Sequence, residues 1–87
     1  MKTILSIEYC TSWGYLDETV SLAQRILKEY KGKIGQLTLI PSSGGVFEVV
    51  YEGKLIFSKK KENRKPNHGE VEAIVRETLG VESTLIF

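Results

Sequence analysis

Two strand-like segments with an amphipathic helix between them determine how this chain can fold. Lys2 to Tyr9 alternates apolar and polar side chains and predicts a strand, and Ile4 suggests that both faces of its sheet are partly covered. Ile34 to Ile40 predicts a second strand. The apolar residues between them recur at steps of three and four and predict one buried helical stripe, which Gly32 ends: Leu16, Val20, Ala23, Ile26, Leu27 and Tyr30. A strand–helix–strand unit of this kind crosses over right-handed and leaves its two strands parallel.

The second half of the chain predicts two more strands and a second helix. Val46 to Tyr51 and Lys54 to Ser58 alternate like strands, and Glu52–Gly53 between them has the composition of a hairpin turn. After the polar stretch 59–66, Asn67 and Glu70 have the spacing of a capping box. An apolar helical stripe follows and consists of Val71, Ile74, Val75 and Leu79. We expect Gly80 to end this helix.

The order of elements is therefore β-α-β-β-β-α, an α/β (α+β) domain with a four-stranded mixed sheet. We assign this single domain to residues 1–80 and a short apolar tail to residues 81–87. A chain of 87 residues buries enough surface for one marginally stable core.

Composition excludes several classes of function. The net charge of +1 gives no electrostatic drive toward nucleic acid, and no apolar run approaches the length of a membrane helix. The strand pattern begins at once, so we expect no signal peptide. Cys10 is the single cysteine and His68 the single histidine, which excludes an internal disulfide and argues against a zinc site. We expect a reduced, cytoplasmic domain with neither a nucleic-acid nor a membrane partner.

The parallel strands bring two loops to one edge of the sheet. Cys10 follows the first strand and the turn cluster Pro41–Gly45 follows the second, so these loops must be neighbours outside the carboxyl ends of the strands. Open α/β sheets place their sites there, and Val46 and Phe47 start the next strand from the same edge.

Cys10 lies between a strand and the start of a helix, where the helix dipole and free N–H groups lower the pKa of a thiol. Asp17 and Glu18 in the first helical turn act in the opposite direction, because negative charge disfavours a nearby thiolate. The alternative interpretation is a small buried apolar side chain at a strand end, which is common for cysteine.

Other residues admit two interpretations each. Gly44–Gly45 either lets backbone approach a ligand or satisfies a tight turn, and Trp13 is either a docking surface or a core plug. For the basic run 59–65 we favour a solvated loop over a phosphate or nucleic-acid site, and for His68 a surface position over a ligand.

Three segments resemble the selenoprotein W-related (Rdx) family. Tyr9 to Tyr15 is similar to its redox loop Y-C-x-x-C/U-G-Y, where U is selenocysteine; Gly44 to Val49 is similar to its G-x-F-E-V strand. Glu52 to Lys61 resembles its G-K-L-I-x-S-K-K-K hairpin. The resemblance spans about Ile4 to Gly80 and implies a thioredoxin-like fold, thiol redox activity linked to glutathione, and binding to partner proteins.

One departure from the family pattern bears on activity. Trp13 stands where the family has its second cysteine or selenocysteine, so Cys10 is the one catalytic thiol that the resemblance assigns. The resemblance then implies a monothiol oxidoreductase of reduced or altered activity, with glutathione as a thiol co-substrate and no tightly bound cofactor. The alternative is a non-catalytic module that binds a client protein. Candidate loop and binding residues are Thr11, Ser12, Trp13, Gly14, Ser43, Gly44, Gly45 and Phe47. The apolar tail or a sheet edge offers a route to self-association.

Overall fold

The structure, a computed structural model, describes residues 4–30, 32–67 and 69–84. Its elements in chain order are β1 (Ile4–Cys10), α1 (Tyr15–Glu29), β2 (Gln36–Ser42), β3 (Phe47–Tyr51), β4 (Lys54–Ser58), α2 (Lys59–Glu62) and α3 (Glu70–Thr84). The predicted order β-α-β-β-β-α is confirmed, with the short α2 added after β4. The predictions for Lys2, Thr3, His68 and the chain end at 85–87 fall outside the described residues.

The four strands form one mixed sheet in the order β2-β1-β3-β4. β1 and β2 are parallel, as the crossover predicts, with Cys10 beside Ser42. β1 and β3 are antiparallel, and so are β3 and β4, where the register shifts between Val49 and Val50. At the hairpin, Glu52 and Gly53 both have positive φ, of 51° and 79°, as a tight two-residue turn requires.

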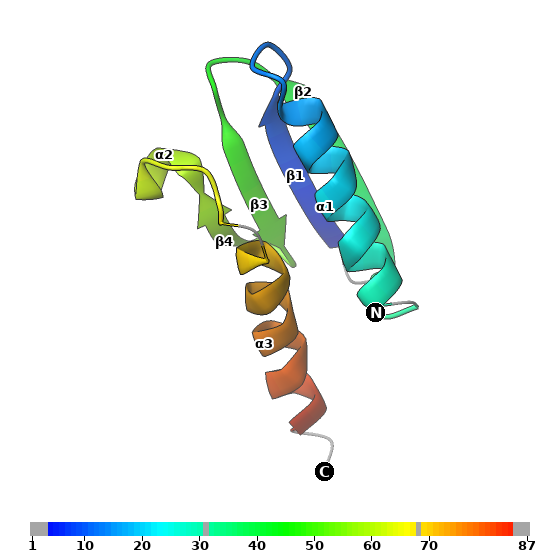
Figure 1. Ribbon diagram of the computed structural model, residues 1–87. Coiled ribbons are helices and arrows are strands. Elements are labelled where there is room, and N and C mark those ends of the chain that lie inside the picture. The colour runs from blue at the N-terminus through cyan, green and yellow to red at the C-terminus, as the bar shows by residue number, and fades with distance from the viewer. Residues whose placement is uncertain (1–3, 31, 68, 85–87) are drawn as a thin grey trace.

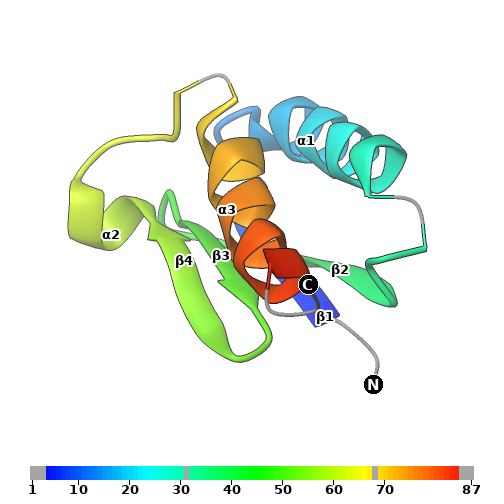
Figure 2. The same ribbon diagram turned by 90° about the horizontal axis from the view of Figure 1, so that it is seen from below.

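Both long helices lie on the same face of the sheet (Figures 1 and 2). The side chains beneath them alternate along the strands and form the core, with Leu5, Ile7, Tyr9, Phe47, Val49 and Tyr51 all buried. On the other face Ser6 and Glu8 are half-buried, and Ile4 is 45% exposed. The second face is thus only partly covered, in line with the expectation, because the two long helices share the other face.

The buried face of α1 is displaced from the predicted stripe. Ala23, Ile26 and Tyr30 are buried as predicted, but Leu16, Val20 and Leu27 are 49%, 48% and 45% exposed. The residues of α1 that are buried in their place are Tyr15, Thr19 and Leu22. The apolar stripe is wider than the contact with the sheet, so one flank of it remains in solvent.

The basic run contains a short helix, which corrects the expected loop. The Ser58 hydroxyl accepts a hydrogen bond from the Lys61 N–H at 3.1 Å and caps α2, and Asn63 ends it in the left-handed conformation. The predicted capping box is only partly found: the Asn67 N–H donates to Glu70 Oε1 at 2.8 Å, but α3 begins at Glu70, so Asn67 is not its N-cap. The predicted stop at Gly80 is wrong, because α3 continues through it to Thr84. No helix of the described ranges is long and apolar enough to cross a membrane.

Candidate functional site

The loop after β1 and the turn after β2 lie together at one end of the sheet, as the parallel strands predict (Figure 1). The Cys10 N–H donates to the Val46 carbonyl at 2.9 Å, and the Thr11 N–H donates to the Ser42 carbonyl at 3.1 Å. The Thr11 hydroxyl reaches the same Ser42 carbonyl at 3.3 Å. These bonds fasten the loop to the ends of both neighbouring strands and fix the backbone around Cys10.

The Cys10 thiol is buried, with 1% of the residue exposed, and it accepts several hydrogen bonds. Burial raises its pKa, but the N–H groups of Ser12, Gly45 and Trp13 and the Ser12 hydroxyl lower it, and the net pKa lies below the ordinary value. N–H donors stabilise the thiolate because they point positive charge at it. The predicted lowering of the Cys10 pKa is thus found. The groups that lower it are donors from the loop and from the turn after β2.

Trp13 lies on the surface and packs against Gly45. The residue is 62% exposed, so the core-plug interpretation is wrong. Gly45 is buried at φ +72°, and a Cβ added there would lie 2.7 Å from Trp13 Cζ3 and 2.9 Å from Cη2. Gly45 therefore both turns the chain and leaves room for the indole ring, while Gly44, with nothing within 4 Å, serves the turn alone.

A row of aromatic rings runs inward from Trp13. Trp13 packs edge-to-face on Tyr15 at 6.1 Å between centroids, and the row continues through Phe47 to Phe57 with centroid spacings of 6.3 Å and 6.4 Å. Three cations lie over these rings: Lys59 over Trp13 at 5.3 Å, Lys65 over Tyr15 at 5.0 Å, and Arg64 over Phe57 at 5.6 Å. The basic run is mostly exposed, as expected, but it also borders the thiol loop, a placement that a charge pattern alone cannot indicate.

The structure gathers some of the predicted residues around Cys10 and separates others from it. Ser12, Trp13 and Gly45 contribute donors to the thiol. Gly14 begins α1 at φ 72°, and Phe47 is buried in the aromatic row. Ser43 and Gly44 lie in the exposed turn, outside the set of groups that donate to Cys10.

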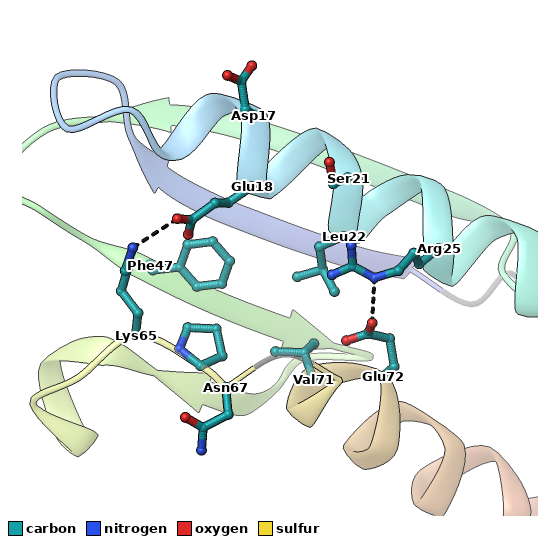
Figure 3. Close-up of a pocket in the computed structure, with 11 residues that line it drawn as sticks. Asp17, Glu18, Ser21, Leu22, Arg25, Phe47, Lys65, Asn67, Val71 and Glu72 are labelled. Atoms are coloured by element: carbon teal, nitrogen blue, oxygen red, sulfur yellow. Dashed lines mark hydrogen bonds and ion pairs between the residues drawn. The ribbon is translucent and has the colours of Figure 1, made fainter.

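A cleft of about 480 Å³ lies between α1, the end of the basic run and the start of α3 (Figure 3). Leu22, Phe47 and Val71 supply its apolar surface. Two ion pairs bridge its walls, Arg25 Nε to Glu72 Oε2 at 2.6 Å and Lys65 Nζ to Glu18 Oε1 at 2.9 Å. Of the predicted site residues only Phe47 lines it. The sequence does not indicate this cleft, because its walls come from segments more than 40 residues apart.

Comparisons with known proteins place the chain in a family. The model of the Rdx family matches residues 4–77. The chain is 36% identical over 64 residues to the selenoproteins W of Macaca mulatta and Pongo abelii, a match that covers 70% of this chain and 71% of each relative.

Two crystal structures have a similar fold along most of the chain. One is a selenoprotein W-related protein from Vibrio cholerae, with 27% identity, a TM-score of 0.81, and coverage of 90% of this chain and 98% of that one. The other is a protein from Bordetella parapertussis, with 26% identity, a TM-score of 0.82, and coverage of 90% and 99%. The predicted β-α-β-β-β-α order and the family resemblance are both confirmed, and the chain belongs to the Rdx family of selenoprotein W-related proteins.

Proposed function

We propose that the protein is a single-thiol redox protein in which Cys10 exchanges disulfides with glutathione or a client protein. The Cys10 thiolate attacks one sulfur of a disulfide, the new Cys10 mixed disulfide forms, and the other sulfur leaves as a thiolate. A second external thiolate then attacks the mixed disulfide and releases Cys10, so the electron pair comes from outside the chain. Trp13 stands at the position where an internal resolving thiol would lie. The external thiolate therefore carries out the step that such a thiol would perform.

The observation that carries this proposal is the set of donors around Cys10. A thiol buried to 1% exposure would ordinarily have a raised pKa, yet three N–H groups and one hydroxyl lower the pKa of this one. Because the thiolate is the nucleophile in disulfide exchange, such donors favour reaction. Because the residue is buried, its surroundings must open before a disulfide can reach the sulfur.

Intact-mass measurement after incubation with oxidised glutathione tests the proposal. We expect the native chain to gain one glutathionyl group, which dithiothreitol removes, while Cys10→Ser gains none. A chain that stays unmodified when native but is modified after denaturation would contradict the proposal, because its thiol would be merely buried.

We further propose that glutathione is the small thiol and binds in the cleft, which the row of rings from Phe47 through Tyr15 to Trp13 connects to the Cys10 loop. Glutathione carries one ammonium and two carboxylate groups, and the cleft presents both cations and carboxylates beside an apolar surface. Lys65→Ala removes one cation from the lining, and Lys60→Ala, outside the lining, is its matched control. We expect only Lys65→Ala to slow adduct formation. A role in redox homeostasis in the cytoplasm fits a free thiol, which glutathione keeps reduced there.

A second candidate function is a binding module that has kept the fold without the chemistry. The exposed Trp13, with Lys59 over its ring, favours it, because tryptophan is an anchor residue at protein interfaces. The rate of Cys10 alkylation as a function of pH separates the two candidates. A midpoint below the free-thiol value of about 8.5 supports redox chemistry, and one at or above it supports the binding module.

A further inference from the structure

One lateral edge of the molecule combines an unpaired strand with an exposed apolar helix flank. β2 is a terminal strand of the sheet, so its outer N–H and C=O groups have no strand beside them among the described elements. The helix that crosses over it, α1, has Leu16, Val20 and Leu27 about half exposed. Residues at these spacings share one helix face.

This flank of α1 points away from the rest of the protein. Arg25 binds Glu72 of α3 and therefore marks the side of α1 that faces α3. Leu16 precedes Arg25 by about two and a half helical turns, so the two side chains point in opposite directions. Figure 2 shows α1 above β2 at one side of the molecule and α3 toward the β4 side.

The strand lacks the features that normally protect an edge. Gln36–Ser42 contains no charged residue, and Ile40 is 41% exposed. Pro41 blocks pairing only at the far end and leaves Gln36–Ile40 open. The opposite edge strand, β4, begins with Lys54, has a register shift against β3 and is followed by the basic α2. These are devices that discourage edge pairing, and β2 has none of them except its terminal proline.

We propose that a second copy of this chain binds at this edge, with β2 antiparallel to its two-fold-related copy. Antiparallel pairing of a strand with itself is self-complementary, which a two-fold interface requires. It would join the two sheets into one eight-stranded sheet with both α1 helices on the same face. This inference does not depend on the chemistry of Cys10.

The dimensions of the two layers agree with this arrangement. A crossover helix lies above its two strands, so the two α1 helices would be separated by about two strand spacings, or about 10 Å. Packed helices lie about 8–10 Å apart, so the exposed flanks would meet as the strands pair. Leu16 of one copy would then face Leu27 of the other, with Val20 near the centre of the contact.

Charge on the helix is also complementary in this orientation. Asp17 follows Leu16 and Lys28 follows Leu27, so both stand on the same side of the apolar flank, at opposite ends of α1. In an antiparallel pair of helices Asp17 of each copy lies beside Lys28 of the other. A parallel pair would instead place like charges together, which costs stability.

Sedimentation equilibrium of the full chain, at concentrations up to about 1 mM, tests the proposal. We expect the mass of two chains, and Val20→Lys or Leu27→Lys should weaken the dimer at least about tenfold, because each buries a charge in an apolar contact. Leu55→Lys on β4 is the matched control, since Leu55 is 50% exposed. A wild-type mass of 9.8 kDa at every concentration would overturn the proposal, as would an equal loss in the Leu55 variant.

A charge exchange tests the orientation without adding charge to the apolar flank. Asp17→Lys and Lys28→Asp should each weaken the dimer several-fold, and the double variant should recover the wild-type affinity. Failure of the double variant to recover would overturn the antiparallel arrangement.

Discussion

Replacing Gly45 with alanine tests whether the Trp13 ring is held against the turn beside Cys10. Gly44→Ala is the matched control, because both glycines have positive φ, 78° and 72°, but only Gly45 touches the ring. An alanine in the left-handed conformation costs about 1–2 kcal/mol, and both variants bear this cost. For Gly44→Ala nothing further is expected, since no atom lies within 4 Å of its new Cβ.

Gly45→Ala must also displace the indole ring, whose atoms would lie as close as 2.7 Å to the new Cβ. The displaced ring loses its edge-to-face contact with Tyr15, worth about 0.5–1.5 kcal/mol, and the Lys59 cation over its face, worth about 0.5–1 kcal/mol. We therefore expect Gly45→Ala to destabilise the protein by about 1–2.5 kcal/mol more than Gly44→Ala.

Urea unfolding measures the two free energies, and fluorescence reports the ring directly because Trp13 is the single tryptophan. Its emission should shift to the red in Gly45→Ala and stay unchanged in Gly44→Ala. In a Trp13→Ala background the two alanine variants should cost the same. Equal destabilisation in the wild-type background, or an unchanged emission spectrum, would refute the packing argument.

Three further predictions concern individual polar groups. Ser12→Ala should move the midpoint of Cys10 alkylation to higher pH, because the lost hydroxyl is one of the donors that lower the thiol pKa. Glu70 has its pKa lowered to about 2 by Arg64 and then by the Asn67 N–H, so the stability it provides is complete above its unfolded pKa and is lost as pH falls toward 2. Glu70→Gln should therefore cost about 1–2 kcal/mol in urea unfolding at pH 7, a cost that falls as pH drops through about 2 and disappears below it. Arg25→Met should cost about 1–3 kcal/mol at pH 7, because it leaves the buried Glu72 carboxylate without its partner.

Each of these has an internal comparison. Arg76→Met breaks the exposed pair with Glu29 and should cost clearly less than Arg25→Met, so an equal loss in both arginine variants would contradict the argument from burial. If Glu70→Gln lowers stability equally at both pH values, the carboxylate charge is not the cause. If Ser12→Ala leaves the pH midpoint of Cys10 alkylation unchanged, the Ser12 hydroxyl is not one of the donors that lower the thiol pKa.

Sequence patterns predicted the features that depend on neighbours in the chain. The alternation of Leu5, Ile7 and Tyr9, the Glu52–Gly53 turn and the hydrogen bond between Asn67 and Glu70 all appear in the structure. The juxtaposition of the Cys10 loop and the turn after β2 followed from topology alone.

Features that depend on distant contacts were not predictable in the same way. The periodicity of α1 shows a wide apolar stripe but not which flank the sheet covers, so Leu16, Val20 and Leu27 were wrongly placed in the core. α3 continues past Gly80 to Thr84, since a glycine permits a helix to stop without enforcing it. The contact of Trp13 with Gly45 joins residues 32 positions apart, and local composition carries no record of it.

The position of β1 inside the sheet has a consequence for the order of folding. Both of its neighbours, β2 and β3, lie downstream, so the first strand synthesised must wait for later segments before it is paired on either side. The β3–β4 hairpin closes through only two turn residues and can form within microseconds on its own. The parallel β1–β2 pair must first close a loop that contains all of α1. Because β1 joins the hairpin to the crossover unit, its insertion is the step that completes the sheet, and substitutions at Leu5 or Ile7 should slow folding more than those in the hairpin.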